Sequence, residues 1–176
     1  ITRVHLEEDT GRLIHEKDYS LVDFNRAGIP LMELVTEPDI KSAKEARKFS
    51  QRLQLILRYL KVSDADMEKG QMRVEANISL KKGKKLGTKV EVKNLNSFRV
   101  VERALDYEIE RQGKVLASGK KVLHETRGWN DRDEVTLSQR EKEQDHDYRY
   151  FPEPDLPPLS LSKDYINKIK AEIPEL

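Results

Sequence analysis

Two alternating stretches decide the fold: MRVEANISL at residues 72–80 and TKVEVK at residues 88–93. In both stretches apolar side chains alternate with polar or charged ones, a period of two that is typical of a strand with one buried face. The basic segment KKGKKLG lies between them at 81–87. Two such strands joined by a short loop favour a β-hairpin, so we predict an antiparallel pair with one apolar and one charged face.

This hairpin would bring acidic side chains together. If both apolar faces point the same way, opposed residue numbers sum to an even number, for example Glu75 with Glu91 or Asn77 with Glu91. Glu7 and Glu8, next to a strand near the N-terminus, would enlarge the cluster. Two like charges about 4 Å apart repel by about 4 kcal/mol at an effective dielectric constant near 20, so something must offset this repulsion.

Three agents could offset the repulsion. A raised pKa is one, and the cations Arg73 and Lys93 are another. The third is a hard divalent ion such as Mg²⁺, which binds all-oxygen clusters and also binds phosphate. The plainer interpretation, that these are solvent-facing charges paired across strands, remains open. We expect His5 beside the cluster, because Mg²⁺ prefers oxygen ligands.

Two long helices are predicted. The first follows the capping box of Ser42 and Glu45 over residues 42–60, and its outer face is basic. The second begins near Asn96 or Ser97 and ends at Gly119. Its predicted inward positions are Phe98, Val101, Leu105, Ile109 and Leu116.

The rest of the chain favours short strands. They are predicted at 1–6, 20–24, 31–35, 121–126 and 135–138, followed by an extended proline-rich segment at 150–158 and a short helix capped by Ser162. The fold class is therefore α+β, an antiparallel β-sheet flanked by helices. We expect one domain over 1–160 and the start of a following helical region over 161–176.

Composition excludes several classes of protein. The 176 residues carry 33 basic and 32 acidic side chains, which gives a net charge of +1, and they include no cysteine. A disulfide scaffold and a thiol nucleophile are therefore excluded. No apolar run is long enough to cross a membrane, and no P-loop, Rossmann or nucleophile-elbow motif occurs. Since the chain begins with Ile1 already in a strand-like pattern, we expect a piece of a longer polypeptide.

Six segments stand out in order along the chain: VHLEEDTG (4–11), SLVDFNRAGIPL (20–31), EPDI (37–40), RVEANIS (73–79), KNLNSF (93–98) and DYRYFPEPD (147–155). Together they resemble the B-subunit family of the aspartyl/glutamyl-tRNA amidotransferases. Any one of them would be weak evidence, whereas six with matching spacing are highly specific. The resemblance spans essentially the whole chain, within the part of the family called the catalytic cradle.

The resemblance implies a ligase. In this family, the B subunit uses ATP and Mg²⁺ to phosphorylate the side-chain carboxylate of Glu-tRNA(Gln) or Asp-tRNA(Asn), and ammonia then displaces the phosphate. It implies partners as well: a glutaminase (the A subunit), a small linking protein (the C subunit) and the aminoacyl-tRNA, with no membrane. It further implies a fold similar to glutamine synthetase and guanidino kinases, and a cytoplasmic location or an organelle of bacterial origin.

Carried over residue by residue, the resemblance implies an acidic catalytic and metal-binding set. It consists of Glu8, Glu75 and Glu91, with Glu7 and His5 adjacent as further metal ligands. Glu75 stands where many bacterial members have Asp. Strand parity would point Glu8 away from His5 and Glu7, so we suppose that the acidic turn breaks the alternation there.

Four cations are candidates for phosphate or substrate contacts, because phosphoryl transfer depends on positioning and on neutralising charge. They are Arg73, Lys93, Arg26 and Arg149, with a surface ion pair as the alternative for each. Gln139 replaces a Met common in the family, and neither Gln139 nor His146 is assigned a catalytic task.

Three expectations concern the chain as a whole. The family's N-terminal strand with further metal ligands and its tRNA-gripping tail are both missing, so we expect this piece to be inactive alone. One alternative function is a noncatalytic tRNA-docking module that uses the basic helix face and Lys81–Lys85. The other is an assembly module that docks a partner through the strap at 148–159.

Overall fold

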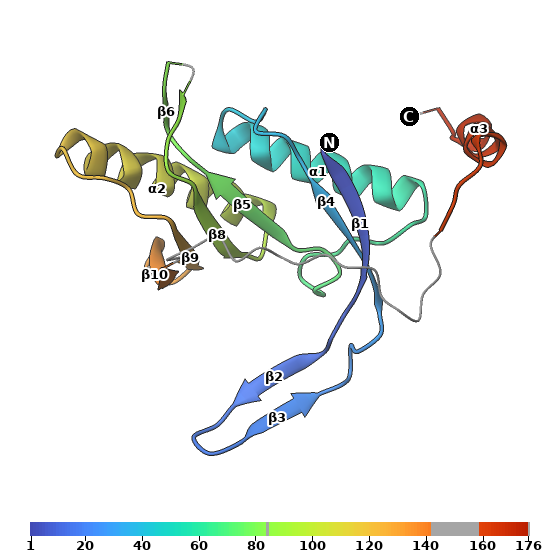
Figure 1. Cartoon of the computed structure of the whole chain (residues 1–176), viewed down its shortest axis with the longest axis horizontal. Coiled ribbons are helices and arrows are strands. Elements are labelled where there is room, and N and C mark those ends of the chain that lie inside the picture. The colour runs from blue at the N-terminus through green and yellow to red at the C-terminus, as the bar shows by residue number, and fades with distance from the viewer. Residues whose placement is uncertain (84, 142–158, 176) are drawn as a thin grey trace. The chain divides into compact units, whose positions relative to one another are not determined.

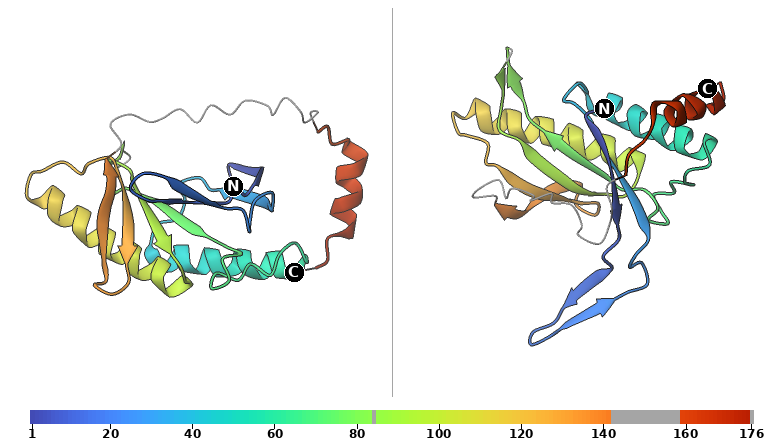
Figure 2. Two further views of the ribbon diagram at one scale, coloured as in Figure 1. Left: turned by 90° about the horizontal axis from the view of Figure 1, so that it is seen from below. Right: turned by 45° about the vertical axis from the view of Figure 1, so that its right-hand side comes forward.

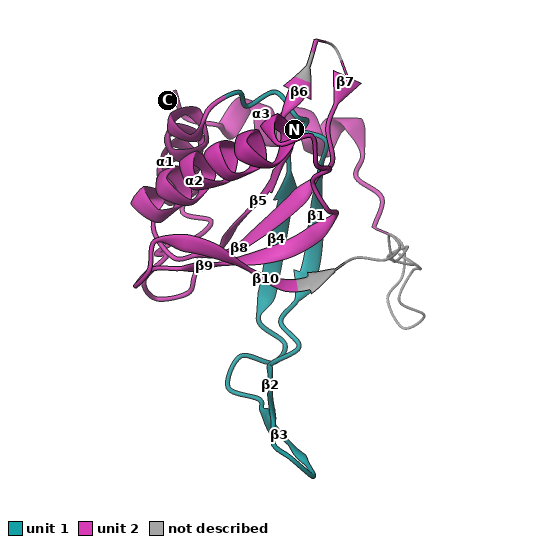
Figure 3. Cartoon of the chain, turned by 90° about the vertical axis from the view of Figure 1, so that its left-hand side faces the viewer, with its two compact units in different colours: residues 1–41 teal, residues 42–176 magenta. Residues whose placement is uncertain are grey.

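The computed structural model describes residues 1–83, 85–141 and 159–175. The chain divides into two compact units, Ile1–Lys41 and Ser42–Leu176 (Figure 3). The predicted division at residue 160 is a different one and stays a prediction. The proline-rich segment at 150–158 lies outside the described residues, and nothing tests its predicted conformation.

The first unit is built from two antiparallel strand pairs. Strand β1 (Arg3–Glu8) pairs with β4 (Pro30–Val35), and β2 (Arg12–His15) pairs with β3 (Ser20–Asp23) within the loop between them (Figure 1). The strands predicted at 1–6, 20–24 and 31–35 are confirmed. Strand β2 was not predicted, because all four of its residues are exposed and they carry no apolar–polar alternation.

The second unit contains a four-stranded sheet in the order β10-β9-β8-β5. Its strands are β5 (Val74–Ile78), β8 (Val90–Leu95), β9 (Glu125–Asn130) and β10 (Val135–Glu141). The predicted antiparallel sheet needs a correction, because β8 and β9 run parallel while the other two pairs are antiparallel. The reason is the long helix between β8 and β9, which returns the chain to the same end of the sheet.

The predicted hairpin is the pair β5–β8. Asn77 lies opposite Glu91 and Ala76 opposite Val92, as even-sum parity requires, and a bulge shifts the register between Val74 and Ala76. The basic connection forms a second small hairpin of its own, β6 (Lys81–Lys82) with β7 (Lys85–Leu86). Of the two pairings named as examples, the structure has the one that sets Glu91 opposite Asn77.

Three helices are seen in the described residues: α1 (Ala43–Tyr59), α2 (Phe98–Ala117) and α3 (Lys163–Glu172). The hydroxyls of Ser42, Ser97 and Ser162 each cap one of them by accepting from the backbone N–H three residues on. Gly119, just beyond the end of α2, has φ of +75°, a left-handed conformation that glycine adopts without a Cβ penalty. All three predicted helices are confirmed.

Helix α2 packs on one face of the sheet, and α1 contacts α2 where the two helices overlap (Figure 2). The core between them contains Val90, Val92, Val101, Ala104 and Trp129. Two of the inward positions predicted for α2 are wrong, since Ile109 and Leu116 are exposed. The buried stripe continues instead through the polar residues Glu108 and Gln112, which apolar periodicity does not detect.

The strand predicted at 121–126 also begins elsewhere, because β9 starts only at Glu125. Val122 contributed to the apolar pattern that predicted a strand there, but it packs into the core from a loop. Among the described residues no helix is both long and apolar enough to span a bilayer. The four-stranded sheet therefore has one face packed against α2 and a second face that is polar. The polar face is the one that matters for function.

Candidate functional site

The polar face of the sheet carries a carboxylate–ammonium cluster on β5 and β8. The ammonium of Lys93 lies 3.5 Å from Glu75 Oε1 and 3.7 Å from Glu91 Oε1. Thr126 on β9 donates a hydrogen bond of 2.7 Å to the other oxygen, Glu91 Oε2. We call Glu75, Glu91 and Lys93 the β8 cluster.

Strand geometry explains why these side chains meet. Glu91 and Lys93 are two residues apart on β8, so they share a face, while Val90 and Val92 point into the core. Glu75 sits within the bulge of β5, and bulges often re-aim a side chain next to a functional site. Glu91 is the most enclosed of the three, with its side chain 17% exposed against 49% for Glu75.

The charge balance of the β8 cluster is one ammonium against two carboxylates. Of the agents considered for offsetting the repulsion, the nearby cation Lys93 is therefore seen directly. Carboxylates still outnumber the ammonium, and their oxygens lie on a polar surface. Such an oxygen-rich, anionic set suits a hard divalent cation, and a lysine beside it suits a phosphate oxygen.

A second group lies in the first unit, on β1 and β4. His5, Glu7 and Glu33 each offer one ligand atom, and these atoms all lie within 4.8 Å of one another. His5 faces Glu33 across the strand pair, and His5 Nδ1 is 3.4 Å from Glu33 Oε2. Glu33 was not predicted, although it is the one charged residue in the otherwise apolar strand β4 and has the right parity to face His5.

Glu8 does not join this group in the way we supposed. The β1–β4 register runs without a break to Glu8 opposite Pro30, so the acidic turn does not interrupt the alternation. Glu8 therefore points to the opposite face from His5 and Glu7. The supposition of an early break is wrong, because pairing with β4 holds β1 extended two residues further than predicted.

Glu8 belongs to the first unit, whereas Glu75 and Glu91 belong to the second. Their convergence on one metal ion stays a prediction. The structure thus brings together Glu75, Glu91 and Lys93 in one unit, and His5 and Glu7 with the unpredicted Glu33 in the other.

The remaining predicted cations have separate outcomes. Arg26 Nε lies 3.0 Å from Asp9 Oδ2, which is the ion pair that we named as the alternative to a substrate contact. Arg73 is exposed immediately before β5. Arg149 lies outside the described residues. On the basic face of α1, Arg47 bonds Glu102 and Arg58 bonds the carbonyl of Asp64.

Behind the β8 cluster lies a buried polar network that was not predicted. Glu108 on α2 is 0% exposed, and it accepts from Arg111 Nε at 2.8 Å and from Thr136 Oγ1 at 2.5 Å. Arg127 on β9 donates to Glu125 at 2.8 Å and lies 3.2 Å from Glu108. A signal was present in the sequence, since Glu108 stands four residues after Ala104 and seven after Val101, on the same helical stripe.

The network sets the protonation of its central carboxylate. Burial by itself would raise the pKa of Glu108, but hydrogen bonds from Arg111, Thr136 and Gln112 outweigh it and hold this pKa below the ordinary value of a glutamate. Burial would likewise lower the pKa of Arg111, yet Glu108 raises it above the usual value. Glu108 and Arg111 are therefore both charged in the neutral range, and the network joins α2 to β9 and β10.

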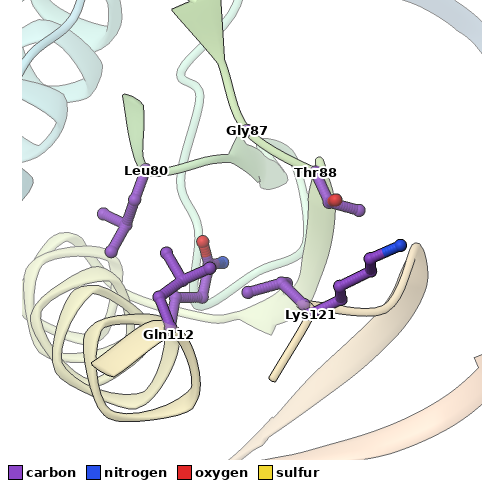
Figure 4. A pocket seen from close by; sticks show the side chains of 7 residues that line it. Leu80, Gly87, Thr88, Gln112 and Lys121 are labelled. Atoms are coloured by element: carbon purple, nitrogen blue, oxygen red, sulfur yellow. The ribbon is translucent and has the colours of Figure 1, made fainter. Parts of the chain in front are cut away.

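A cavity of about 140 Å³ lies on another part of the second unit (Figure 4). Leu80, Gly87, Gln112 and Lys121 are among the residues that line it, and none of the β8 cluster is. It is smaller than the roughly 300–1,000 Å³ typical of small-molecule sites. We therefore place the candidate site on the polar sheet face and not in this cavity.

The fold and the two groups define a class: an α+β protein whose strand pairs present carboxylates suited to a divalent cation. Residues 1–167 match a family model described as the GatB/GatE catalytic domain. The chain belongs to this family, as its six motif segments indicated.

The curated relatives agree with this assignment. The chain is 56% identical to the B subunit of an aspartyl/glutamyl-tRNA(Asn/Gln) amidotransferase from Herpetosiphon aurantiacus, with 100% of this chain and 37% of the relative covered. It is 55% identical to proteins of the same name from Persephonella marina and Thermotoga maritima, covering 38% of each. The chain thus spans a little over a third of the length of these relatives.

Proposed function

We propose that this chain forms the phosphoryl-transfer part of a tRNA-dependent amidotransferase. The reaction is the ATP-dependent phosphorylation of the side-chain carboxylate on Glu-tRNA(Gln) or Asp-tRNA(Asn), followed by amidation, which makes the whole protein a ligase. The single observation that carries this proposal is the β8 cluster, two carboxylates that share one lysine on the polar face of the sheet.

Each member of the β8 cluster has a role in the proposal. Glu91 and Glu75 hold Mg²⁺ through their carboxylate oxygens, and Lys93 contacts a phosphate oxygen of ATP. Catalysis of phosphoryl transfer is mostly positioning and charge neutralisation, so these groups bind and orient without becoming covalently modified. His5, Glu7 and Glu33 form a second group able to take a cation.

The donor set supports a magnesium ion. Glu75 and Glu91 provide oxygen ligands only, and these two carboxylates outnumber the single ammonium of Lys93. Mg²⁺, when bound, neutralises negative charge on the phosphates. The imidazole of His5 is a less suitable ligand for Mg²⁺ and suits a softer divalent ion better.

The proposal extends to partners. Ammonia would come from a glutaminase, the A subunit of the complex, and a small third protein, the C subunit, would tie that glutaminase to this chain. The carboxylate acceptor would be presented by aminoacyl-tRNA. Support comes from the curated relatives, whose shared name is that of an amidotransferase for tRNA(Asn) and tRNA(Gln).

The test substitutes Glu91 in the full-length protein assembled with its partner proteins. Glu91→Ala should abolish formation of the phosphorylated aminoacyl-tRNA from labelled ATP, because the most enclosed carboxylate of the cluster is removed. Glu110→Ala is a matched control, since Glu110 is a glutamate on the exposed side of α2 with its side chain 65% exposed. Unchanged phosphorylation in Glu91→Ala would exclude Glu91 from the site.

A further inference from the structure

The carboxylate of Glu91 is held at both oxygens. Thr126 Oγ1 donates to Oε2 at 2.7 Å, and the ammonium of Lys93 is 3.7 Å from Oε1. A distance of 2.7 Å is the usual length of a well-formed O–H···O hydrogen bond. Glu91 and Thr126 are direct neighbours in the parallel β8–β9 pair, so the bond follows from the register.

The backbone around Thr126 is anchored by hydrogen bonds on the opposite face of β9. The two chain neighbours of Thr126, Glu125 and Arg127, point to that opposite face, where they bond each other at 2.8 Å. Arg127 also donates to Thr136 Oγ1 at 2.8 Å and lies 3.2 Å from the fully buried Glu108. Thr126 is 7% exposed, so it stands between two clamped residues and has little freedom to move.

We propose that Thr126 is a positioning residue, which fixes the Glu91 carboxylate in the one orientation that presents Oε1 to a divalent cation. This inference rests on the proposed function, in which Glu91 takes the cation. A carboxylate that is already oriented loses less conformational freedom on binding. Loss of a hydrogen bond to a metal-ligating group typically lowers metal affinity or activity by about 10- to 100-fold.

Two substitutions at Thr126 distinguish a positioning role from a purely structural role. Thr126→Val keeps the branched shape and removes the hydroxyl, whereas Thr126→Ser keeps the hydroxyl and removes the methyl group. A purely structural threonine would be mimicked by valine as well as by serine. A positioning threonine needs its hydroxyl, so serine should restore function and valine should not.

The experiment measures Mn²⁺ binding by electron paramagnetic resonance, together with kcat and KM for ATP, in the full-length protein with its partners. Thr126→Val should bind Mn²⁺ roughly 10-fold more weakly. It should also lower kcat more than it raises KM, while Thr126→Ser recovers most of the affinity. Thermal melting identifies folded variants, and Thr126→Ala replaces Thr126→Val if the latter does not fold.

A Glu91→Gln variant separates the two levels of the proposal. If Glu91→Gln weakens Mn²⁺ binding but Thr126→Val does not, the positioning role is overturned while the proposed function stands. Equal losses in Thr126→Val and Thr126→Ser would also overturn it, because the hydroxyl would not be the cause. If Glu91→Gln binds Mn²⁺ and turns over like the unmodified protein, the proposed function fails, and the inference fails with it.

Discussion

Lys93 is the residue on which the charge balance of the β8 cluster depends. Its ammonium lies within 3.7 Å of carboxylate oxygens on both Glu75 and Glu91, and its own side chain is 37% exposed. A lysine in this position does two opposing things. It reduces the repulsion between the carboxylates, and it competes with any divalent cation for the same oxygens.

Replacing Lys93 with methionine should therefore separate cation binding from turnover. Without the ammonium, Mn²⁺ should bind about five-fold more tightly, an effect of roughly 1 kcal/mol for partly exposed charges. Phosphorylation of the aminoacyl-tRNA should nevertheless slow, because the proposed phosphate contact is lost. Isothermal titration calorimetry and a turnover assay measure the two effects, with Lys93→Arg as the charge-preserving control. Identical Mn²⁺ affinity in Lys93→Met would show that Lys93 does not compete at this site.

Tight packing surrounds Gly128 on β9. A methyl group added there would collide with the amide of Gln139 and would lie 3.0 Å from Asn94 Nδ2. Gly128 lies opposite Lys93 in the β8–β9 register, so Gln139 reaches the neighbourhood of the β8 cluster. No task was predicted for Gln139, and the irregular register of β10 between Ser138 and Arg140 is what determines its direction.

Gly128→Ala should destabilise the protein by about 1 kcal/mol, because the flexible end of Gln139 must move aside. The double variant Gly128→Ala/Gln139→Ala should recover most of that loss, since the colliding amide is then absent. Urea denaturation of the two single variants and the double variant measures the coupling. Strictly additive losses would contradict this packing.

At the scale of elements, the hydrophobic periods predicted helices and strands well. Helices α1 and α2 follow from helical spacing and serine caps, and the β5–β8 hairpin follows from apolar–polar alternation. Hydrophobic periodicity did not predict the buried polar residues Glu108 and Gln112. It also did not predict β2, because this exposed strand has no buried face. Local spacing also contains no information on the parallel β8–β9 pairing.

The Glu108 network joins these elements, and it predicts how stability depends on pH. Glu108→Gln removes the negative charge that compensates the guanidinium groups of Arg111 and Arg127. The free energy of unfolding at pH 7 should therefore fall by about 3 kcal/mol. Because the folded protein lowers the pKa of Glu108, its stabilising contribution is complete above the unfolded value of about 4.3. The contribution is lost as pH falls through the lowered pKa.

The difference in unfolding free energy between the unmodified protein and Glu108→Gln should therefore shrink as the pH is lowered from 7 to about 3. Urea denaturation across this range measures it. Glu110→Gln, on the exposed side of the same helix, should change stability by less than about 0.5 kcal/mol at neutral pH. A difference that stays constant with pH would contradict an ionised Glu108.

At the scale of the whole molecule, two compact units each carry a group of candidate ligands. Strand alternation and the family resemblance predicted His5, Glu7, Glu75 and Glu91 as candidate metal ligands, and Lys93 as a phosphate contact beside them. Sequence reasoning did not predict Glu33 or Thr126. Strand register places Glu33 opposite His5 and Thr126 opposite Glu91, and spacing along the chain does not reveal that register. The chain spans a little over a third of the length of its relatives, so the activity of the whole protein stays a proposal.

The proposed function depends above all on the β8 cluster holding a divalent cation. Anomalous diffraction from crystals of the protein soaked in Mn²⁺ tests this most directly. We predict an anomalous peak about 2.1 Å from a carboxylate oxygen of Glu91, with Glu75 next to it and Lys93 displaced. Manganese peaks found only elsewhere, with Lys93 still bridging Glu75 and Glu91, would contradict it.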